Sequence, residues 1–369
     1  MKRRLLFAGL VLVLVGCAGP GTVAPTTGTT AAETPAAVTP TPAPPRQLTV
    51  MTHDSFDISE ETIAAFEAAY NAEVVILKSG DAGLMLNQAI LSAGNPLADV
   101  LYGVDNTLMS RALEADIFEP YHSLLLDAIP DDLELDPRHR LLPVDYGDVC
   151  LNYDKAWFAG RNLQPPDDLL DLVQPAYRGL TVVENPASSS PGLAFMLATI
   201  ATFGEEGDYT WLDYWQALRE NDVLVTDGWE DAYWGHFTYA SDGDRPIVVS
   251  YASSPPVEVY FSGEDFEEAP TGVVVSDGAC FRQVEFVGIL RGTPNRDLAE
   301  AWVDFMLDVT FQEDIPLHMF VFPANENAAL PDVFARFALI PARPASLEPA
   351  RIQANLERWI EQWREAVLR

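Results

Sequence analysis

Three serines stand directly before a Pro-Gly pair in the stretch Pro186–Phe195, PASSSPGLAF, and an apolar run follows them. Serine favours the position before a helix and proline favours its first turn, so we predict that Ser190 caps a helix beginning at Pro191. A helix N-terminus presents free N–H groups and a partial positive charge, which suit an anion or a strong acceptor. One serine is enough to cap, which leaves Ser188 and Ser189 for a ligand, although an ordinary capped helix explains the motif equally well.

Three other polar residues stand at the ends of predicted strands. His53 follows the run LTVM, Asp81 follows EVVILKSG, and Tyr251 ends the run VVSY. Ligands of open α/β sheets bind beside the carboxyl ends of strands, so these side chains are candidates for one site. An acid among aromatic rings is the usual means of holding a flat cation.

Aromatic residues recur four apart in DGWEDAYWGHF, where Trp229, Tyr233 and Phe237 would share one face of a helix. Such a stripe belongs to a hydrophobic core more often than to a binding surface. Both interpretations stay open from the sequence.

Signatures of catalysis are missing from the sequence. It contains no G-x-S-x-G, H-E-x-x-H, C-x-x-C or G-x-x-x-x-G-K motif, and its five histidines do not cluster along the chain. We therefore expect a protein that is not an enzyme and that uses no metal or other cofactor. A surface-anchored, phosphatase-like enzyme is the alternative, and Ser189 with His53 is the pairing that it would need.

The elements that must position these residues alternate between strand and helix, which is typical of an α/β fold with a mostly parallel sheet covered on both faces. Apolar spacing predicts a first group of strands at 48–52, 73–78 and 99–103, with helices at 60–70, 84–94 and 105–116. Either Asp57 or Ser59 would cap the first helix. A second group has strands at 222–226 and 245–252, with helices at 209–221 and 229–237. Two further helices are predicted at 295–308 and 351–368.

Two apolar segments, 141–154 and 280–290, are candidates for strands that cross between two lobes. Cys150 and Cys280 fall one on each segment, and they form an even pair in an oxidising compartment. We predict a disulfide between them, which requires the two strands to be neighbours. Two buried thiols are the alternative.

The N-terminus is predicted to be processed and not folded. Residues 1–17 form a basic and then apolar signal that ends in LVGC, which resembles a bacterial lipobox and implies acylation of Cys17, although a plain secretory signal is the alternative. Residues 18–46 are rich in Pro, Thr, Ala and Gly, which predicts a disordered tether. We expect an extracytoplasmic protein that is lipid-anchored to the outer face of the cytoplasmic membrane, at the cell surface or in the periplasm.

The net charge excludes some partners. It is −33 for the whole chain, and it becomes −36 without the three basic residues of the signal. Nucleic acid and anionic lipid both need a basic face, so we expect no nucleic-acid partner and no membrane binding beyond the lipid anchor. The same charge keeps the protein soluble, and it favours a cationic ligand.

Eight motifs resemble, in order, the thiamine-binding proteins of bacterial ABC importers, from about residue 48 to the C-terminus. They are LTVMTHDSF, SGDAG, ADVLYGVDNTL, PVDYGDVCLNYDK, SSSPGLAF, TDGWEDAY, VVSYASSPP and FVFPAN. The resemblance implies a two-lobed periplasmic-binding-protein fold of type 2, with mixed, mostly parallel sheets joined by hinge strands. Lobe 1 would comprise 47–145 and 275–325, and lobe 2 would comprise 146–274. The sequence does not decide to which lobe the C-terminal helical segment 326–369 belongs.

The resemblance also implies a function and the residues that perform it. A monomer would capture thiamine, or a thiamine phosphate, between its lobes and deliver it to an ABC permease in the cytoplasmic membrane. Asp81 would meet the cationic ligand, and Trp229 and Tyr251 would pack on its rings. Tyr233, His53 and Phe320 are further candidates for ligand binding. Ser189, with Ser188 and Ser190 beside it, would bind the phosphate or hydroxyethyl end.

Three positions depart from the pattern of the family, because His53, Val257 and Phe320 stand where other members carry different aromatic residues. Stacking of two rings contributes about 0.5–1.5 kcal/mol beyond burial, so these changes bear on affinity and on ligand choice. A polyamine or another small cation is therefore the runner-up ligand, and ferric iron is disfavoured because no adjacent tyrosine pair is present. A structural surface lipoprotein is the third class.

Overall fold

The computed structural model describes residues 44–369. The predicted signal (1–17), the lipidation site Cys17 and nearly all of the predicted tether (18–46) lie outside the described residues. The first strand begins at Arg46, the last residue that was assigned to the tether.

The first half of the sheet contains three parallel strands, with β1 between β2 and β3. Its elements are β1 (Arg46–Thr52), α1 (Glu60–Tyr70), β2 (Ala72–Lys78), α2 (Ala82–Leu91), β3 (Val100–Asp105) and α3 (Met109–Glu114). Of the two caps proposed for α1, Ser59 is the one used, since its side chain accepts a hydrogen bond from the backbone N–H of Thr62. The strand–helix alternation expected from apolar spacing is confirmed in this half.

The second half repeats this arrangement, with β6 parallel to both β7 and β8. Its elements are β6 (Thr181–Glu184), α5 (Ser190–Phe203), α6 (Trp211–Glu220), β7 (Leu224–Thr226), η4 (Asp231–His236), β8 (Ile247–Tyr251) and α7 (Pro255–Ser262). The helix expected over 229–237 is shorter than predicted, because η4 is a single π-helical segment.

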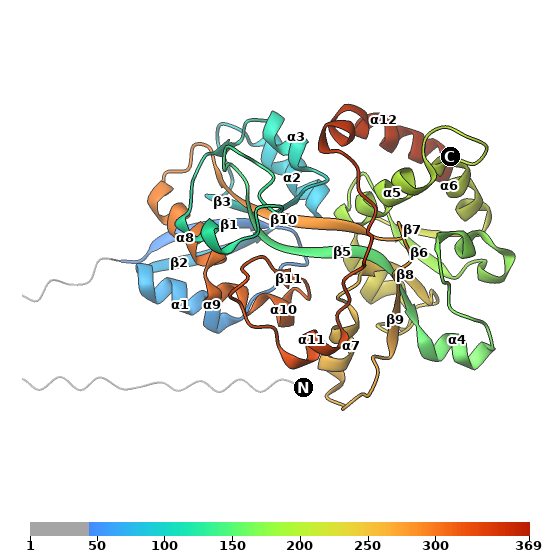
Figure 1. Cartoon of the computed structure of the whole chain (residues 1–369). Coiled ribbons are helices and arrows are strands. Elements are labelled where there is room, and N and C mark those ends of the chain that lie inside the picture. Colours follow the sequence, from blue (N-terminus) through green and yellow to red (C-terminus); the bar gives the residue numbers. More distant parts are fainter. Residues whose placement is uncertain (1–43) are drawn as a thin grey trace, which may run out of the picture. The chain divides into compact units, whose positions relative to one another are not determined.

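Two long strands connect the halves, as the sequence predicted. β5 (Leu142–Asp154) and β10 (Phe281–Leu290) pair antiparallel, and Figure 1 shows both running from the β1–β3 half to the β6–β8 half. The strand order is β2-β1-β3-β10-β5-β8-β6-β7, with β4 (Phe118–Glu119) on β10, and β9 (Thr271–Val274) and β11 (Phe322–Pro323) on β5. Parallel pairing is thus confined to the two halves, and the connecting strands make the sheet mixed.

The predicted disulfide is present. Cys150 and Cys280 are bonded, with their Cα atoms 4.4 Å apart. The bond is possible because Phe281 pairs with Val149, which brings Cys280, directly before β10, next to Cys150 on β5. The expectation that the bond joins the two crossing strands is therefore confirmed.

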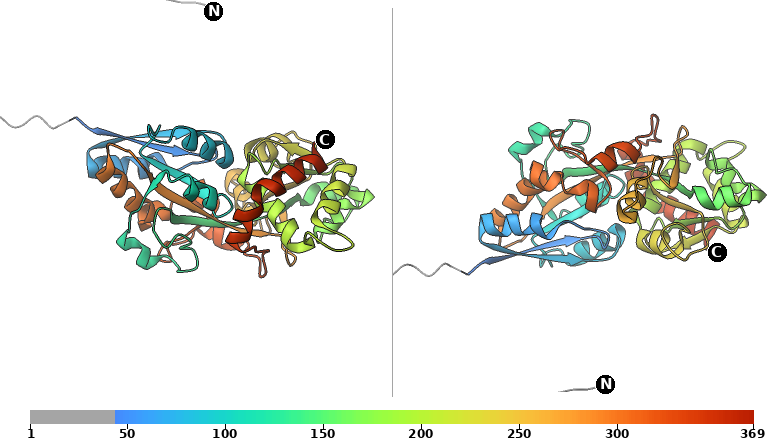
Figure 2. Two further views of the ribbon diagram at one scale, coloured as in Figure 1. Left: turned by 90° about the horizontal axis from the view of Figure 1, so that it is seen from above. Right: turned by 90° about the horizontal axis from the view of Figure 1, so that it is seen from below.

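The C-terminal helix α12 (Pro349–Val367) packs on the second half. Trp363 lies edge-to-face against Trp215 of α6, with ring centroids 5.5 Å apart, and Figure 2 shows α12 lying over this half. Its first turns also reach the other half, where Gln353 hydrogen-bonds Glu114 of α3. The segment whose lobe the sequence left open therefore contacts both halves, while the lobe boundaries themselves stay a prediction.

The remaining helices are short except for α8, which has 12 residues and packs on β10. They are η1 (Leu124–Ala128), α4 (Lys155–Arg161), η2 (Leu169–Val173), η3 (Pro175–Tyr177), α8 (Arg296–Leu307), α9 (Val309–Gln312), α10 (Ile315–His318) and α11 (Asp332–Phe337).

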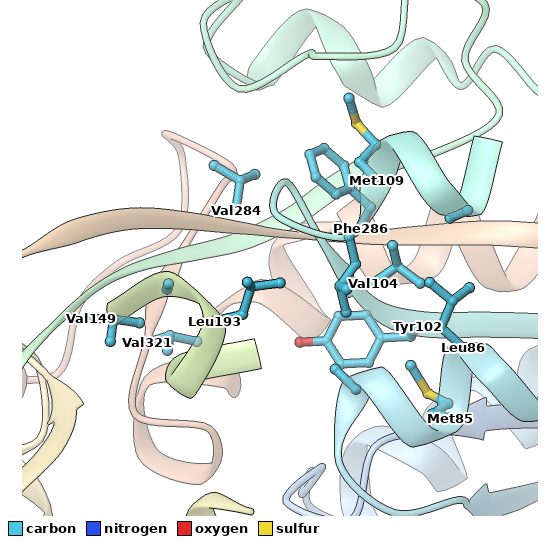
Figure 3. Close-up of a cluster of buried hydrophobic side chains, with 14 of the residues drawn as sticks. Met85, Leu86, Tyr102, Val104, Met109, Val149, Leu193, Val284, Phe286 and Val321 are labelled. Atoms are coloured by element: carbon cyan, nitrogen blue, oxygen red, sulfur yellow. The ribbon is translucent and has the colours of Figure 1, made fainter. Parts of the chain in front are cut away.

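One buried apolar cluster includes side chains from both halves and from the strands between them. Figure 3 shows Met85 and Leu86 of α2 beside Tyr102 of β3, whose hydroxyl points away from them, toward the region of Leu193 and Val321. A polar group that leaves an apolar core needs partners, and those of Tyr102 belong to the candidate site.

Candidate functional site

A cavity of about 230 Å³ is lined by residues from both halves of the sheet. The first half contributes residues that follow β1 and β2, and the second half contributes the start of α5, the segment around Trp229, the end of β8 and part of α7. The lining side chains are His53, Asp54, Ser55, Asp57, Asp81, Ala82, Ser190, Pro191, Trp229, Glu230, Trp234, Tyr251, Ser254, Val257, Phe261, Glu285, His318, Met319, Phe320 and Val321. The expectation that ligand residues gather at the carboxyl ends of parallel strands agrees with this position.

Asp81 joins the two halves at this cavity. Its Oδ1 accepts hydrogen bonds from the backbone N–H of Ala82 at 2.7 Å and of Ser190 at 3.1 Å, and its Oδ2 accepts from Trp229 N–H at 3.2 Å. Burial raises the pKa of Asp81, while the Ser190 and Trp229 donors act in the opposite direction. These three backbone N–H donors point at the two carboxylate oxygens of Asp81. They favour its ionised form, because an ionised carboxylate can accept hydrogen bonds but cannot donate one.

The serine motif differs from its prediction in one respect. Helix α5 begins at Ser190, so Ser189 occupies the cap position. The side chain of Ser189 makes no capping hydrogen bond to the helix. The carboxylate of Asp81 takes the N–H of Ser190 instead. The prediction that Ser190 caps a helix starting at Pro191 is wrong, because an acid from the other half of the sheet supplies a stronger acceptor.

The three serines separate in the structure. The Ser190 hydroxyl lines the cavity and hydrogen-bonds the Gln283 amide, whereas Ser188 donates to the Asp227 carbonyl at 2.6 Å. Ser188 and Ser189 are buried and do not line the cavity. Only Ser190 of the three candidates thus lines the cavity.

His53 faces a buried acid. Its Nε2 lies 3.6 Å from Oε1 of Glu285, whose Oε2 is 3.1 Å from the Tyr102 hydroxyl, and that hydroxyl also bonds Asp145. Burial alone would lower the pKa of His53, but attraction to Glu285 raises it above its ordinary value. Burial opposes ionisation of Glu285 as well, yet its nearness to His53 lowers its pKa.

Asp145 behaves in the opposite way from Glu285. Burial, followed by repulsion from Glu285, raises the pKa of Asp145 well above its ordinary range. At this end of the cavity, His53 and Glu285 therefore favour each other's charged form, while the neighbouring Asp145 holds its proton more tightly than an ordinary aspartate does.

Two glycines let aromatic rings approach the strands beside the cavity closely. A Cβ on Gly103, which has φ +101°, would lie 2.3 Å from Cδ2 of His53, and a Cβ on Gly147 would lie 2.9 Å from Cδ1 of Tyr251. The Tyr251 hydroxyl donates to the Gln283 side chain at 2.8 Å. Both predicted site residues are thus held by close packing on β3 and β5.

The aromatic stripe is divided between cavity and core. Trp229 lines the cavity and stacks on Tyr233, with ring centroids 4.8 Å apart and planes 22° apart. Tyr233 and Phe237 are fully buried behind it, and Tyr233 hydrogen-bonds Glu258. Tyr233 is therefore a support for Trp229 and not part of the cavity lining.

The three departures from the family pattern, His53, Val257 and Phe320, all line the cavity. Phe320 adopts a left-handed backbone, with φ 53°, and its ring packs 5.8 Å from that of Phe261. The predicted residues Asp81, Trp229 and Tyr251 line it as well.

Sequence reasoning missed several lining residues. Trp234 lies edge-to-face with Trp229 and is 41% exposed, and the acids Asp54, Asp57, Glu230 and Glu285 also line the cavity. Asp54 and Glu230 are adjacent in sequence to predicted residues, a signal that was available. Glu285 lies inside a crossing strand, where no local pattern marks it.

Comparison with known proteins places this geometry in a family. Residues 95–337 match the family described as bacterial extracellular solute-binding protein. Over 328 residues the chain is 30% identical to the thiamine-binding periplasmic protein of Escherichia coli (strain K12), covering 87% of this chain and 94% of that protein. The chain belongs to the bacterial extracellular solute-binding family. The resemblance found in the sequence is thereby confirmed, as is the two-lobed binding-protein fold.

Solved structures agree with this family. A structure described as a periplasmic thiamin binding protein is similar with a TM-score of 0.77 and 28% identity, and it covers 88% of this chain and 97% of its own. A ferric binding protein from Campylobacter jejuni has a TM-score of 0.69 at 16% identity, with 86% and 99% covered, which shows the shared fold alone. These relatives are binding proteins, so the expectation that this solute-binding protein is not an enzyme is confirmed.

Two further searches concern only the described part of the chain. From residue 44 onward, no helix combines the length and apolar character that crossing a bilayer requires. Over the same residues, no three His, Cys, Asp or Glu side chains group in a way that would hold a metal ion.

Proposed function

We propose that this solute-binding protein is the extracytoplasmic component of an ABC importer and that its ligand is thiamine. The observation that carries the proposal is a cavity whose lining combines the rings of Trp229, Trp234 and Tyr251 with the carboxylate of Asp81. The names of the relatives support the same ligand. The Escherichia coli relative is described as a thiamine-binding periplasmic protein, and the similar solved structure is described as a periplasmic thiamin binding protein.

The chemistry of thiamine suits this lining. The ligand has two flat rings, one of which carries a permanent positive charge, and aromatic faces attract both flat surfaces and cations. The Trp229 ring is fixed for this purpose, because its Nε1 donates to Ser250 at 2.9 Å and its face rests on Tyr233. A preformed aromatic wall costs little entropy when the ligand binds.

Contacts between the two halves provide a means of signalling that the ligand is bound. Asp81 and Gly83 of the first half bond Ser190, Trp229 and Ser188 of the second, the last through Gly83 N–H to the Ser188 carbonyl at 3.1 Å. Lobes that close on a ligand present a surface that a permease distinguishes from the open form. We propose that delivery of thiamine follows recognition of this closed form.

Anchoring by lipid at Cys17 completes the proposal. Acylation of that thiol would keep an acidic protein at the outer face of the membrane, which its own surface charge does not do. We expect the protein in the membrane fraction of cells, and in the soluble fraction after Cys17→Ser. Equal distribution of the two forms would refute lipid anchoring.

Calorimetric titration of the purified protein with thiamine tests the proposed function. We expect saturable one-to-one binding that weakens by about tenfold or more in Trp229→Ala, because the variant loses both stacking and buried apolar area. Trp157→Ala is the matched control, since Trp157 packs on Phe158 and Arg161 away from the cavity. Absence of heat with thiamine, together with saturable binding of spermidine, would transfer the function to a polyamine.

A further inference from the structure

We infer that Gln283 is a positioning residue of the cavity and that Asp105 decides which way its side-chain amide faces. Gln283 belongs to β10 and Asp105 ends β3. Both side chains are buried, and neither lines the cavity. The arrangement itself does not depend on the identity of the ligand, but measuring its effect with thiamine rests on the proposed function.

The side-chain amide of Gln283 makes three hydrogen bonds behind the cavity wall. Its Nε2 donates to Oδ2 of Asp105 and to the Ser190 hydroxyl, and its Oε1 accepts from the Tyr251 hydroxyl at 2.8 Å. Asp105 belongs to the first half of the sheet, whereas Ser190 and Tyr251 belong to the second half and line the cavity. Gln283 thus holds two residues of the wall, and it is itself held by an acid of the other half.

The surroundings of Asp105 fix the direction of this amide. Its Oδ1 accepts from the backbone N–H and the hydroxyl of Thr107, at 2.8 and 2.6 Å, and from the backbone N–H of Leu108 at 3.1 Å. Burial raises the pKa of Asp105, but the hydrogen bonds from Thr107 and Gln283 favour its ionised form. An ionised carboxylate pairs with the NH₂ group of an amide and not with its oxygen. The oxygen of Gln283 must therefore face Tyr251.

Gln283 fixes Tyr251 and Ser190 before a ligand arrives. Tyr251 is held by Gln283 at its hydroxyl and by close approach to Gly147 at its ring edge. Ser190 is held by Gln283 at its hydroxyl and by Asp81 at its backbone N–H, at 3.1 Å. A side chain that is already ordered loses no rotamer freedom on binding, which improves affinity by about fivefold for each such side chain.

Calorimetric titration with thiamine tests the role of Gln283. Gln283→Met keeps the length of the side chain and removes its hydrogen bonds, so it should weaken binding about 25-fold by loosening two side chains. In a Tyr251→Phe background the same change should weaken binding only about fivefold, because Tyr251 has already lost its hydrogen bond. Equal losses in the two backgrounds, or no loss in either, would overturn the inference.

Gln312→Met is the matched control. Gln312 is also fully buried, and its Nε2 donates to the carbonyls of Val144 at 2.8 Å and Met306 at 2.7 Å, outside the cavity lining. Its replacement should lower the melting temperature as Gln283→Met does, but it should leave the affinity for thiamine unchanged. A comparable loss of affinity in this variant would show that destabilisation alone weakens binding, which would refute the inference.

The hydroxyl proton of Tyr251 reports on the amide without any ligand. A buried, hydrogen-bonded hydroxyl proton exchanges slowly with water, so NMR should detect it in the wild-type protein and lose it in Tyr251→Phe and Gln283→Met. Asp105→Asn should abolish the signal as well. Its oxygen must stay toward the donors of Thr107 and Leu108, so its NH₂ group faces Gln283 and turns the NH₂ group of that amide toward Tyr251. A signal that is absent from the wild-type protein, or that persists in Asp105→Asn, would overturn the inference.

The two experiments separate the inference from the proposed function. A wild-type protein that does not bind thiamine would refute the proposed function, and the hydroxyl signal would still decide the inference. Thiamine binding with equal losses in the two backgrounds would refute the inference and leave the proposed function in place.

Discussion

Glu258 is a buried acid directly behind the aromatic wall of the cavity, and its ionisation should control folding stability. It belongs to α7, is 6% exposed, and accepts hydrogen bonds from the Tyr233 hydroxyl and, at 3.2 Å, from the Thr271 hydroxyl. Burial raises its pKa from 4.5 to about 7, although both hydrogen bonds act in the opposite direction. The replacement Glu258→Gln keeps an oxygen that can accept from Tyr233, but it cannot ionise.

The sign of the effect follows from the raised pKa. The folded state binds the proton more tightly than the unfolded state, so the stabilisation is fully present below about pH 4.5 and is lost as the pH rises through about 7. At about 1.4 kcal/mol for each pH unit, that window corresponds to a loss of about 3 kcal/mol in the free energy of unfolding. The variant lacks this loss, because its amide stays neutral throughout.

Urea unfolding at pH 5 and pH 8, followed by tryptophan fluorescence, measures the effect. We expect the wild-type protein to lose about 2.5 kcal/mol more than Glu258→Gln between these two pH values. Glu264→Gln, in the exposed segment that follows α7, is the control and should keep the wild-type difference. If Glu258→Gln also kept that difference, the carboxyl of Glu258 would have to be hydrated in the folded protein, and the reasoning from its burial would be refuted.

Two further predictions concern packing and the covalent link. Replacing Cys150 and Cys280 by serine opens a link across 130 residues, which should lower the free energy of unfolding by about 5 kcal/mol in a guanidinium titration. If the free energy of unfolding fell by less than about 1 kcal/mol, the disulfide would not stabilise the protein by restricting the unfolded chain, as this prediction assumes. Gly192→Ala places a Cβ 2.5 Å from the Glu184 carbonyl oxygen and should destabilise by about 1–3 kcal/mol, seen as a lower melting temperature. Gly160→Ala, with open space around it in α4, should leave that temperature unchanged or raise it.

Local elements could be predicted because their signals are local. The apolar spacing around Phe66 and the cap at Ser59 act within one or two turns of the same helix. The crossing strands could also be predicted from the sequence. Both β5 and β10 are buried along most of their length, so each appears in the sequence as a long apolar run. Their adjacency made the bond between Cys150 and Cys280 possible.

The site was only partly predictable. Asp81, Trp229 and Tyr251 were found because they follow or precede recognisable elements and match the motifs of a family. Tyr233 was among the ligand-binding candidates, but it is fully buried and does not line the cavity. Glu285 lies on a buried strand, and nothing in its neighbours distinguishes it from a core position.

The sequence by itself determined the strand and helix pattern, the acidic character of the protein and its family. Tertiary structure alone decided which acceptor sits at the start of α5. The sequence predicted that the hydroxyl of Ser190, at the start of the helix, would be the capping acceptor. In the structure the acceptor is the carboxylate of Asp81, which lies 109 residues earlier in the sequence. A charged acceptor binds an N–H group more strongly than a hydroxyl does, and only the packing of the two halves brings that charge to the helix.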